Sequence, residues 1–70
     1  MHKTFKQWMQ EVDLYIRKVI GLDHECIADW GYYDAYESGE TALEAAIQAL
    51  EFDGTVPEEY IFEILFPSID

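Results

Sequence analysis

Basic residues are missing from most of this 70-residue chain, because all four Lys and Arg residues lie within the first 18 positions. The chain carries 15 Asp and Glu residues and a formal net charge of −11 at pH 7. Only Glu11 and Asp13 lie among the basic residues, so the other 13 carboxylates follow position 18. Phosphate backbones and anionic membrane surfaces both attract clustered cations. The pattern therefore argues against direct binding to nucleic acid or a membrane, and it favours a protein partner that is basic or neutral.

Cysteine and long apolar runs are also scarce. The single cysteine, Cys26, excludes an internal disulfide and a site built from several thiolates. No apolar run approaches the roughly 18 residues of a membrane span. The first ten residues lack the basic-then-apolar order of a signal peptide. We therefore expect a cytoplasmic protein.

Four glycines and two prolines divide the chain, and the first segment has a clear helical pattern. Apolar residues recur at steps of three and four from Phe5 to Ile20, which is the periodicity of one helix face. Thr4 is a favourable N-cap, and Gly21 follows at the position that glycine prefers after a helix. The pattern predicts a helix over about residues 4–20.

The signals for a second long helix lie in the middle of the chain. Thr41 and Glu44 have the spacing of a capping box, in which each side chain accepts from an unpaired backbone N–H. An apolar stripe with several alanines follows, and Gly54 ends it. These signals predict a helix over about residues 42–52.

The last apolar segment has mixed signals. Thr55 and Glu58 repeat the capping-box spacing, and Pro67 supplies a stop. The sequence YIFEILF at 60–66 also has the β-branched and aromatic content of a strand. The start signal favours a helix over 57–65, and the strand is the alternative.

Between the first two helices lies an aromatic-rich segment, residues 22–40, without regular periodicity. Asp23 is placed to cap a short helical turn, and residues 33–37 can form another turn before Gly39. The whole pattern predicts an all-α fold, with three main helices in a single domain over residues 1–70.

The residues that carry chemistry do not form a convincing site. Adjacent residues in a turn usually point apart, whereas a metal site needs its ligands to converge. The surrounding negative charge opposes formation of a reactive thiolate at Cys26, and no phosphate-binding or triad motif is present. We therefore predict a capped loop with a buried thiol, no metal or cofactor, and no enzymatic activity. The residues considered for a metal site, which together include every common type of metal ligand, are Asp23, His24, Glu25, Cys26 and Asp29.

Two segments are candidates for binding a partner. Carboxylates alternate with aromatic residues over 29–40, and exposed Trp and Tyr beside charge are typical of interface hot spots. The alternative is that these rings close the core of a small domain. The wide apolar face of 57–66 is the second candidate, either for a protein partner or for a homodimer. The candidate partner-binding residues are Trp30, Tyr32, Tyr33, Tyr36, Glu37, Glu40, Tyr60, Phe62 and Phe66.

Two short patterns carry a resemblance to a known group of proteins. They are Phe5-x-x-Trp8-Met9-x-x-Val12-Asp13 and Tyr32-x-Asp34-x-Tyr36-x-x-Gly39. Over about residues 5–50 the chain resembles a group of small acidic uncharacterised proteins that bacteria, plasmids and phages encode. The resemblance implies a prokaryotic or phage source, and hence the host cytoplasm for a phage protein. It implies no activity, substrate or catalytic residue.

Three functional hypotheses follow. The first is a non-enzymatic module that binds one protein partner. The alternative is an acidic mimic of nucleic acid that inhibits a host nucleic-acid-binding protein, although Gln48 interrupts the acidic row that Glu44 and Glu51 begin. The third, an antitoxin-type regulator that folds against its partner, lacks a basic DNA-binding segment.

Overall fold

A computed structural model describes residues 3–67, and all regular elements in this part of the chain are helical. Residues 1, 2 and 68–70 of the predicted single domain lie outside it. The all-α prediction is confirmed, with one α-helix more than the three expected. The elements are α1 (Phe5–Ile20), the 3₁₀ turn η1 (His24–Cys26), α2 (Tyr32–Glu37), α3 (Ala42–Asp53) and α4 (Glu58–Leu65).

Helix α1 begins and ends where the sequence predicts. The Thr4 hydroxyl accepts from the Gln7 N–H, and the Gln7 side chain accepts from the Thr4 N–H, both at 3.1 Å. At the other end Gly21 has a φ of +74°, a left-handed conformation that side chains disfavour. Its N–H donates to the carbonyl of Arg17, which satisfies one of the free carbonyls of the last turn.

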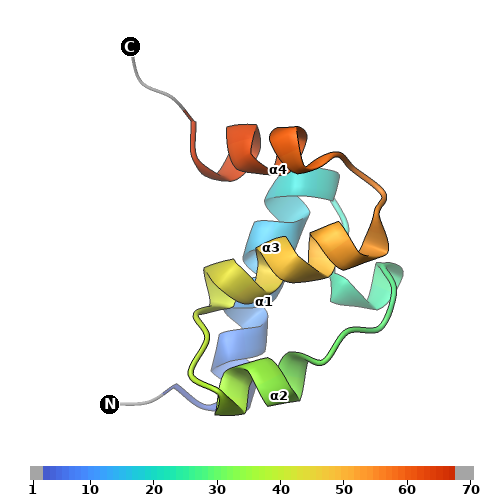
Figure 1. The fold of residues 1–70 in the computed structure, drawn as a ribbon. Coiled ribbons are helices and arrows are strands. Elements are labelled where there is room, and N and C mark those ends of the chain that lie inside the picture. Colours follow the sequence, from blue (N-terminus) through green and yellow to red (C-terminus); the bar gives the residue numbers. More distant parts are fainter. Residues whose placement is uncertain (1–2, 68–70) are drawn as a thin grey trace.

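The other helices are arranged around α1 (Figure 1). Helix α3 crosses α1, while α2 lies towards the beginning of α1 and α4 lies at its far end. Small side chains on α3 permit this close crossing, because Ala45, Ala46 and Ala49 are fully buried. Ile16 of α1 and Leu50 of α3 supply the larger buried side chains. The core thus lies between α1 and α3, and the shorter helices extend it at both ends.

The segment 22–40 has more structure than the sequence predicts. Asp23 caps η1 by accepting from the Glu25 N–H, as expected. The expected single turn at 33–37 is the six-residue helix α2. Its N-cap, Gly31, has no polar side chain, so the usual start signal is missing. Helix α2 ends in a Schellman motif, in which the Gly39 and Glu40 N–H groups donate to earlier carbonyls and Gly39 has a φ of +86°.

The last segment is the helix α4, and the strand alternative is wrong. The predicted capping box does not form, however. Pro57 occupies the N-cap position and offers no side-chain acceptor, while the Thr55 hydroxyl donates to the carboxylate of Asp53 instead. Helix α4 is held by apolar burial, since the Ile61 side chain is 0% exposed and Leu65 packs beside it.

Candidate functional site

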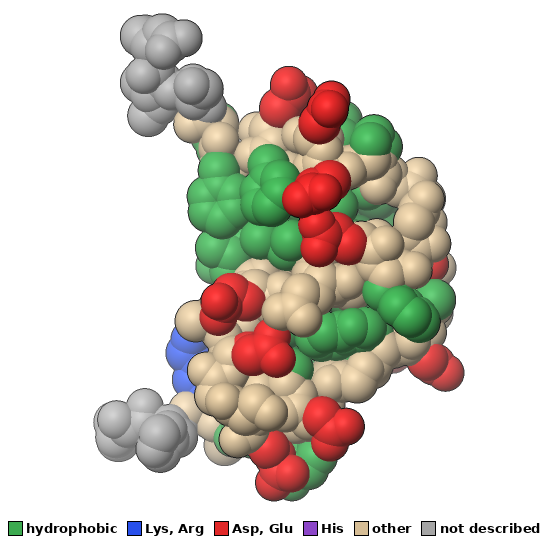
Figure 2. Space-filling model, viewed as in Figure 1, with side chains coloured by type: hydrophobic (Ala, Val, Ile, Leu, Met, Phe, Trp, Pro, Cys, Tyr) green, Lys and Arg blue, Asp and Glu red, His purple; other side chains and the backbone are tan. Residues whose placement is uncertain are grey.

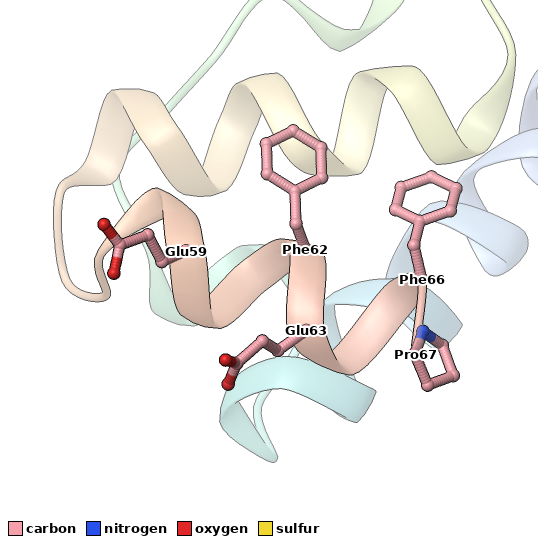
Figure 3. A pocket seen from close by; sticks show the side chains of 5 residues that line it. All are labelled: Glu59, Phe62, Glu63, Phe66 and Pro67. Carbon is pink, nitrogen blue, oxygen red and sulfur yellow. The ribbon is translucent and has the colours of Figure 1, made fainter. Parts of the chain in front are cut away.

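Phe62 of α4 and Phe66, the C-cap residue that follows this helix, form an exposed aromatic pair. Phe62 and Phe66 are four residues apart, a spacing that places side chains above one another on a helix face. Their ring centroids lie 5.9 Å apart, and Figure 3 shows both rings projecting from the same side of α4. Phe62 is 37% exposed and Phe66 is 50% exposed. Single exposed apolar side chains are common on protein surfaces, but two adjacent exposed rings form a patch.

An open depression lies against these rings. We call its apolar part, Phe62, Phe66 and Pro67, the α4 patch. The two carboxylates that also line it, Glu59 and Glu63, form the acidic rim (Figure 3). The depression has a volume of about 770 Å³ but is wide open to solvent. A shallow surface of this kind suits a macromolecular contact better than an enclosed small ligand.

The helical spacing explains how one short helix carries a core face and an exposed patch. Ile61 points into the core, and the Phe62–Phe66 row is turned about 100° from it. The acidic rim, Glu59 and Glu63, lies further round the helix, on the side of the Phe62–Phe66 row that faces away from Ile61. Tyr60 and Ile64, both exposed, lie on the other flank of α4. The patch is therefore an apolar strip between the buried face and a strip of negative charge.

The surroundings of the patch are acidic. Figure 2 shows a continuous apolar area with Asp and Glu side chains along one border. No Lys or Arg occurs after position 18 of the sequence. Where α3 meets α4, the pKa of Glu51 is raised above its ordinary value by desolvation, by the charge of Glu58 and by a hydrogen bond to Glu58. The junction of α3 and α4 thus contributes negative charge to the surroundings of the patch and no cation.

Three of the four aromatic residues of the other candidate segment, residues 29–40, lie in the core or pack against it. Tyr32 is 8% exposed and offers almost no surface to a partner. Trp30 is half-buried against it, with ring centroids 5.3 Å apart. Tyr36 packs edge-on against Phe5 and Trp8. For these three rings the structure matches the alternative interpretation, in which they close the core.

The rest of that segment divides between surface and structure. Tyr33 and Glu37 are exposed on α2, although Tyr33 also contacts the edge of Phe5. The carbonyl of Glu40 accepts from the Trp8 indole N–H at 3.0 Å, and its carboxylate accepts from Gln48. Glu40 therefore joins α1 to the middle of α3.

A polar cluster that the sequence did not predict joins η1 to α1. One carboxylate oxygen of Asp13 accepts from the His24 backbone N–H at 2.9 Å and lies 2.6 Å from the ring Nδ1. The Tyr32 hydroxyl is buried nearby without a hydrogen-bond partner. Burial, followed by the charges of Asp13, Asp29 and Asp53, raises the pKa of Tyr32 to about 12. The only sequence signal was that Asp13 lies beside the apolar stripe of α1.

The predicted environment of Cys26 is wrong, and the metal-ligand types nearby do not gather. The Cys26 side chain is exposed, because η1 turns it outward while Ile27 packs against the core. Within residues 3–67 there is no group of three or more His, Cys, Asp and Glu side chains that could hold a metal ion. In the same range no helix is long and apolar enough to cross a membrane.

Fold and surface together define a small acidic all-α protein that carries an exposed aromatic patch at the end of α4. The chain belongs to the family of unknown function DUF5419, whose model matches residues 4–53. The match spans α1 to α3, so α4 and its patch lie outside it.

Two curated relatives are both called "Gene 87 protein". The protein of Mycobacterium phage D29 is 45% identical over 47 residues, which are 67% of this chain and 87% of that protein. The protein of Mycobacterium phage L5 is 42% identical over 50 residues, which are 71% of this chain and 94% of that protein. No solved structure matches the chain. The relationship to small phage proteins is therefore confirmed, while the two motifs that suggested it stay a prediction.

Proposed function

We propose that this chain is a non-enzymatic interaction module that binds a protein partner through the α4 patch. The observation that carries the proposal is the pair of adjacent, exposed rings of Phe62 and Phe66 beside an open depression. Aromatic anchors that lose their remaining solvent contact on binding supply much of the free energy of protein interfaces.

The acidic-mimic alternative makes a different demand on the surface. A mimic of a phosphate backbone needs many regularly spaced, accessible carboxylates. Here Glu44 is held in the capping box of α3, and Glu40 is bonded to Gln48. The exposed apolar pair supports an interface of the ordinary protein–protein kind instead.

Affinity capture from a mycobacterial lysate tests the proposal. We expect the wild-type protein to retain one partner through a high-salt wash, because apolar burial is insensitive to screening. The double variant Phe62→Ala/Phe66→Ala should lose that partner. The matched control, Leu14→Ala/Leu22→Ala, removes two exposed apolar side chains elsewhere and should retain it.

Circular dichroism of all three proteins checks that the helices remain intact in the variants. A partner that the α4 double variant still retains contradicts the proposal. A nucleic-acid-binding protein that is retained only at low salt, and equally by all three proteins, supports the acidic mimic instead.

A further inference from the structure

We infer that the α4 patch takes a cationic amphipathic helix, with two adjacent apolar side chains on one face and Lys or Arg along its border. This inference rests on the proposed function and names the chemistry of the partner. Its basis is the juxtaposition of two parallel strips on α4, the rings of Phe62 and Phe66 and the carboxylates of Glu59 and Glu63.

The two strips match the spacing of a helical ligand. Each strip is a pair of residues four positions apart, which on a helix corresponds to a rise of about 6 Å. A helix that lies along α4 presents its own side chains at the same interval. Apolar residues at i and i+4 then meet the two rings, while basic residues one position round meet the acidic rim.

The negative charge around the patch favours a ligand that carries positive charge. The only Lys and Arg side chains of the chain precede residue 19. Lys3 lies 2.7 Å from Glu11, and Arg17 lies 3.5 Å from Asp23. Lys18, in the last turn of α1, has its Nζ 5.9 Å from the centroid of the Tyr15 ring. Within residues 3–67 no Lys or Arg forms an ion pair with Glu59 or Glu63, so the acidic rim keeps its negative charge. A ligand that carries Lys or Arg supplies the missing positive charge and gains orientation from it.

A second copy of the chain fits the patch poorly. A two-fold dimer through the patch would bring Glu59 and Glu63 of both copies to one interface. Each copy also carries a net charge of −11, so the whole molecules repel one another. An added β-strand is no better, since residues 3–67 contain no strand whose edge it could extend. A cationic helix meets neither obstacle.

Three synthetic 18-residue peptides test the inference against the full chain by fluorescence anisotropy at 50 and 300 mM NaCl. The first is an amphipathic helix of Leu and Lys. The second has Glu in place of Lys, and the third has the Leu and Lys residues in a scrambled, non-amphipathic order. We expect binding of the first, at least tenfold weaker binding of the third, and no binding of the second.

Variants separate the patch from general attraction to an acidic protein. Phe62→Ala/Phe66→Ala should weaken binding of the Leu–Lys helix at least 30-fold, and Glu59→Gln/Glu63→Gln at least fivefold. The matched control Glu25→Gln/Asp34→Asn also removes two negative charges, one from η1 and one from α2, and should change the affinity less than twofold. Both control residues are exposed, and α2 lies at the opposite end of α1 from α4.

The inference is overturned if the scrambled peptide binds as tightly as the helix. It is also overturned if the two double charge variants weaken binding equally, or if no peptide binds. The failure of the proposed function is a separate result. If a lysate partner depends on Phe62 and Phe66 but not on Glu59 and Glu63, the interaction module stands and the cationic helix is wrong.

Discussion

Tyr32 places a polar hydroxyl group among the apolar side chains of the core. Its ring contacts Trp30 and His24, and its oxygen is buried without a partner. An unpaired buried hydroxyl costs about 1–3 kcal/mol. The same burial, with three nearby carboxylates, raises the pKa to about 12. The Tyr32 hydroxyl therefore lacks a hydrogen bond, while the ring packs against Trp30 and His24.

Tyr32→Phe should therefore stabilise the protein by about 1 kcal/mol, because it removes the unpaired hydroxyl and keeps the ring. The pH dependence has a definite sign. Folded Tyr32 holds its proton more tightly than unfolded tyrosine, so stability is lost as the pH rises from about 10 towards about 12. Urea unfolding of both proteins at pH 7 and 10.5 measures this. A variant that is less stable than the wild type at pH 7 contradicts the expectation.

Glu51 and Glu58 form a like-charged contact between α3 and α4. The raised pKa of Glu51 means that the folded state binds its proton more tightly than the unfolded state does. The wild type should thus lose stability as the pH rises through that pKa, whereas Glu51→Gln should not show this component. Both groups are exposed, so the gain at neutral pH should stay below about 0.5 kcal/mol. Thermal unfolding between pH 4 and 7 measures the difference, and a less stable variant at pH 7 would exclude the repulsion.

Among the elements, α4 has a buried face that holds it to the core and an exposed face that we propose as the binding surface. Ile61→Ala should destabilise the protein by about 2–5 kcal/mol, because it empties a fully buried position. Phe62→Ala should cost only about 1–2 kcal/mol, because more than a third of that residue's surface already contacts water. Chemical denaturation compares the two. Equal losses would show that Phe62 belongs to the core and is not free for a partner.

The helices that the sequence predicted well are those with both a start and a stop signal. For α1 and α3, the capping residues Thr4 and Thr41 and the glycines that follow fix both ends. Helix α2 has neither a polar N-cap nor sufficient length for a periodic stripe, and its contacts with α1 stabilise it instead. The box expected at Thr55 failed because Pro57 took the N-cap position.

The part of the candidate site that depends on local sequence was predictable, and the part that depends on distant contacts was not. Local sequence shows that 57–66 has more apolar residues than one buried face needs, so Phe62 and Phe66 could be named. Which rings of 29–40 are buried depends on contacts with α1, far away in sequence. The pairing of Asp13 with His24 joins residues eleven positions apart, and no periodic pattern marks it.

At the scale of the whole molecule, negative charge should keep copies apart. We expect a monomer in analytical ultracentrifugation at 50 mM NaCl, because a dimer through 57–66 would oppose two acidic rims. At 1 M NaCl the charges are screened and the exposed rings favour weak association. A dimer at low salt that Phe62→Ala/Phe66→Ala abolishes would instead support the homodimer.

If the α4 patch is the binding surface, a ligand should perturb α4 more than any other helix. Titration of the ¹⁵N-labelled protein with the Leu–Lys amphipathic peptide, followed by ¹H–¹⁵N correlation spectra, tests it most directly. We expect the largest shift changes to cluster at residues 59–66, with η1 and α2 nearly unaffected. Shift changes spread evenly over the carboxylates of α2, α3 and α4 would contradict it.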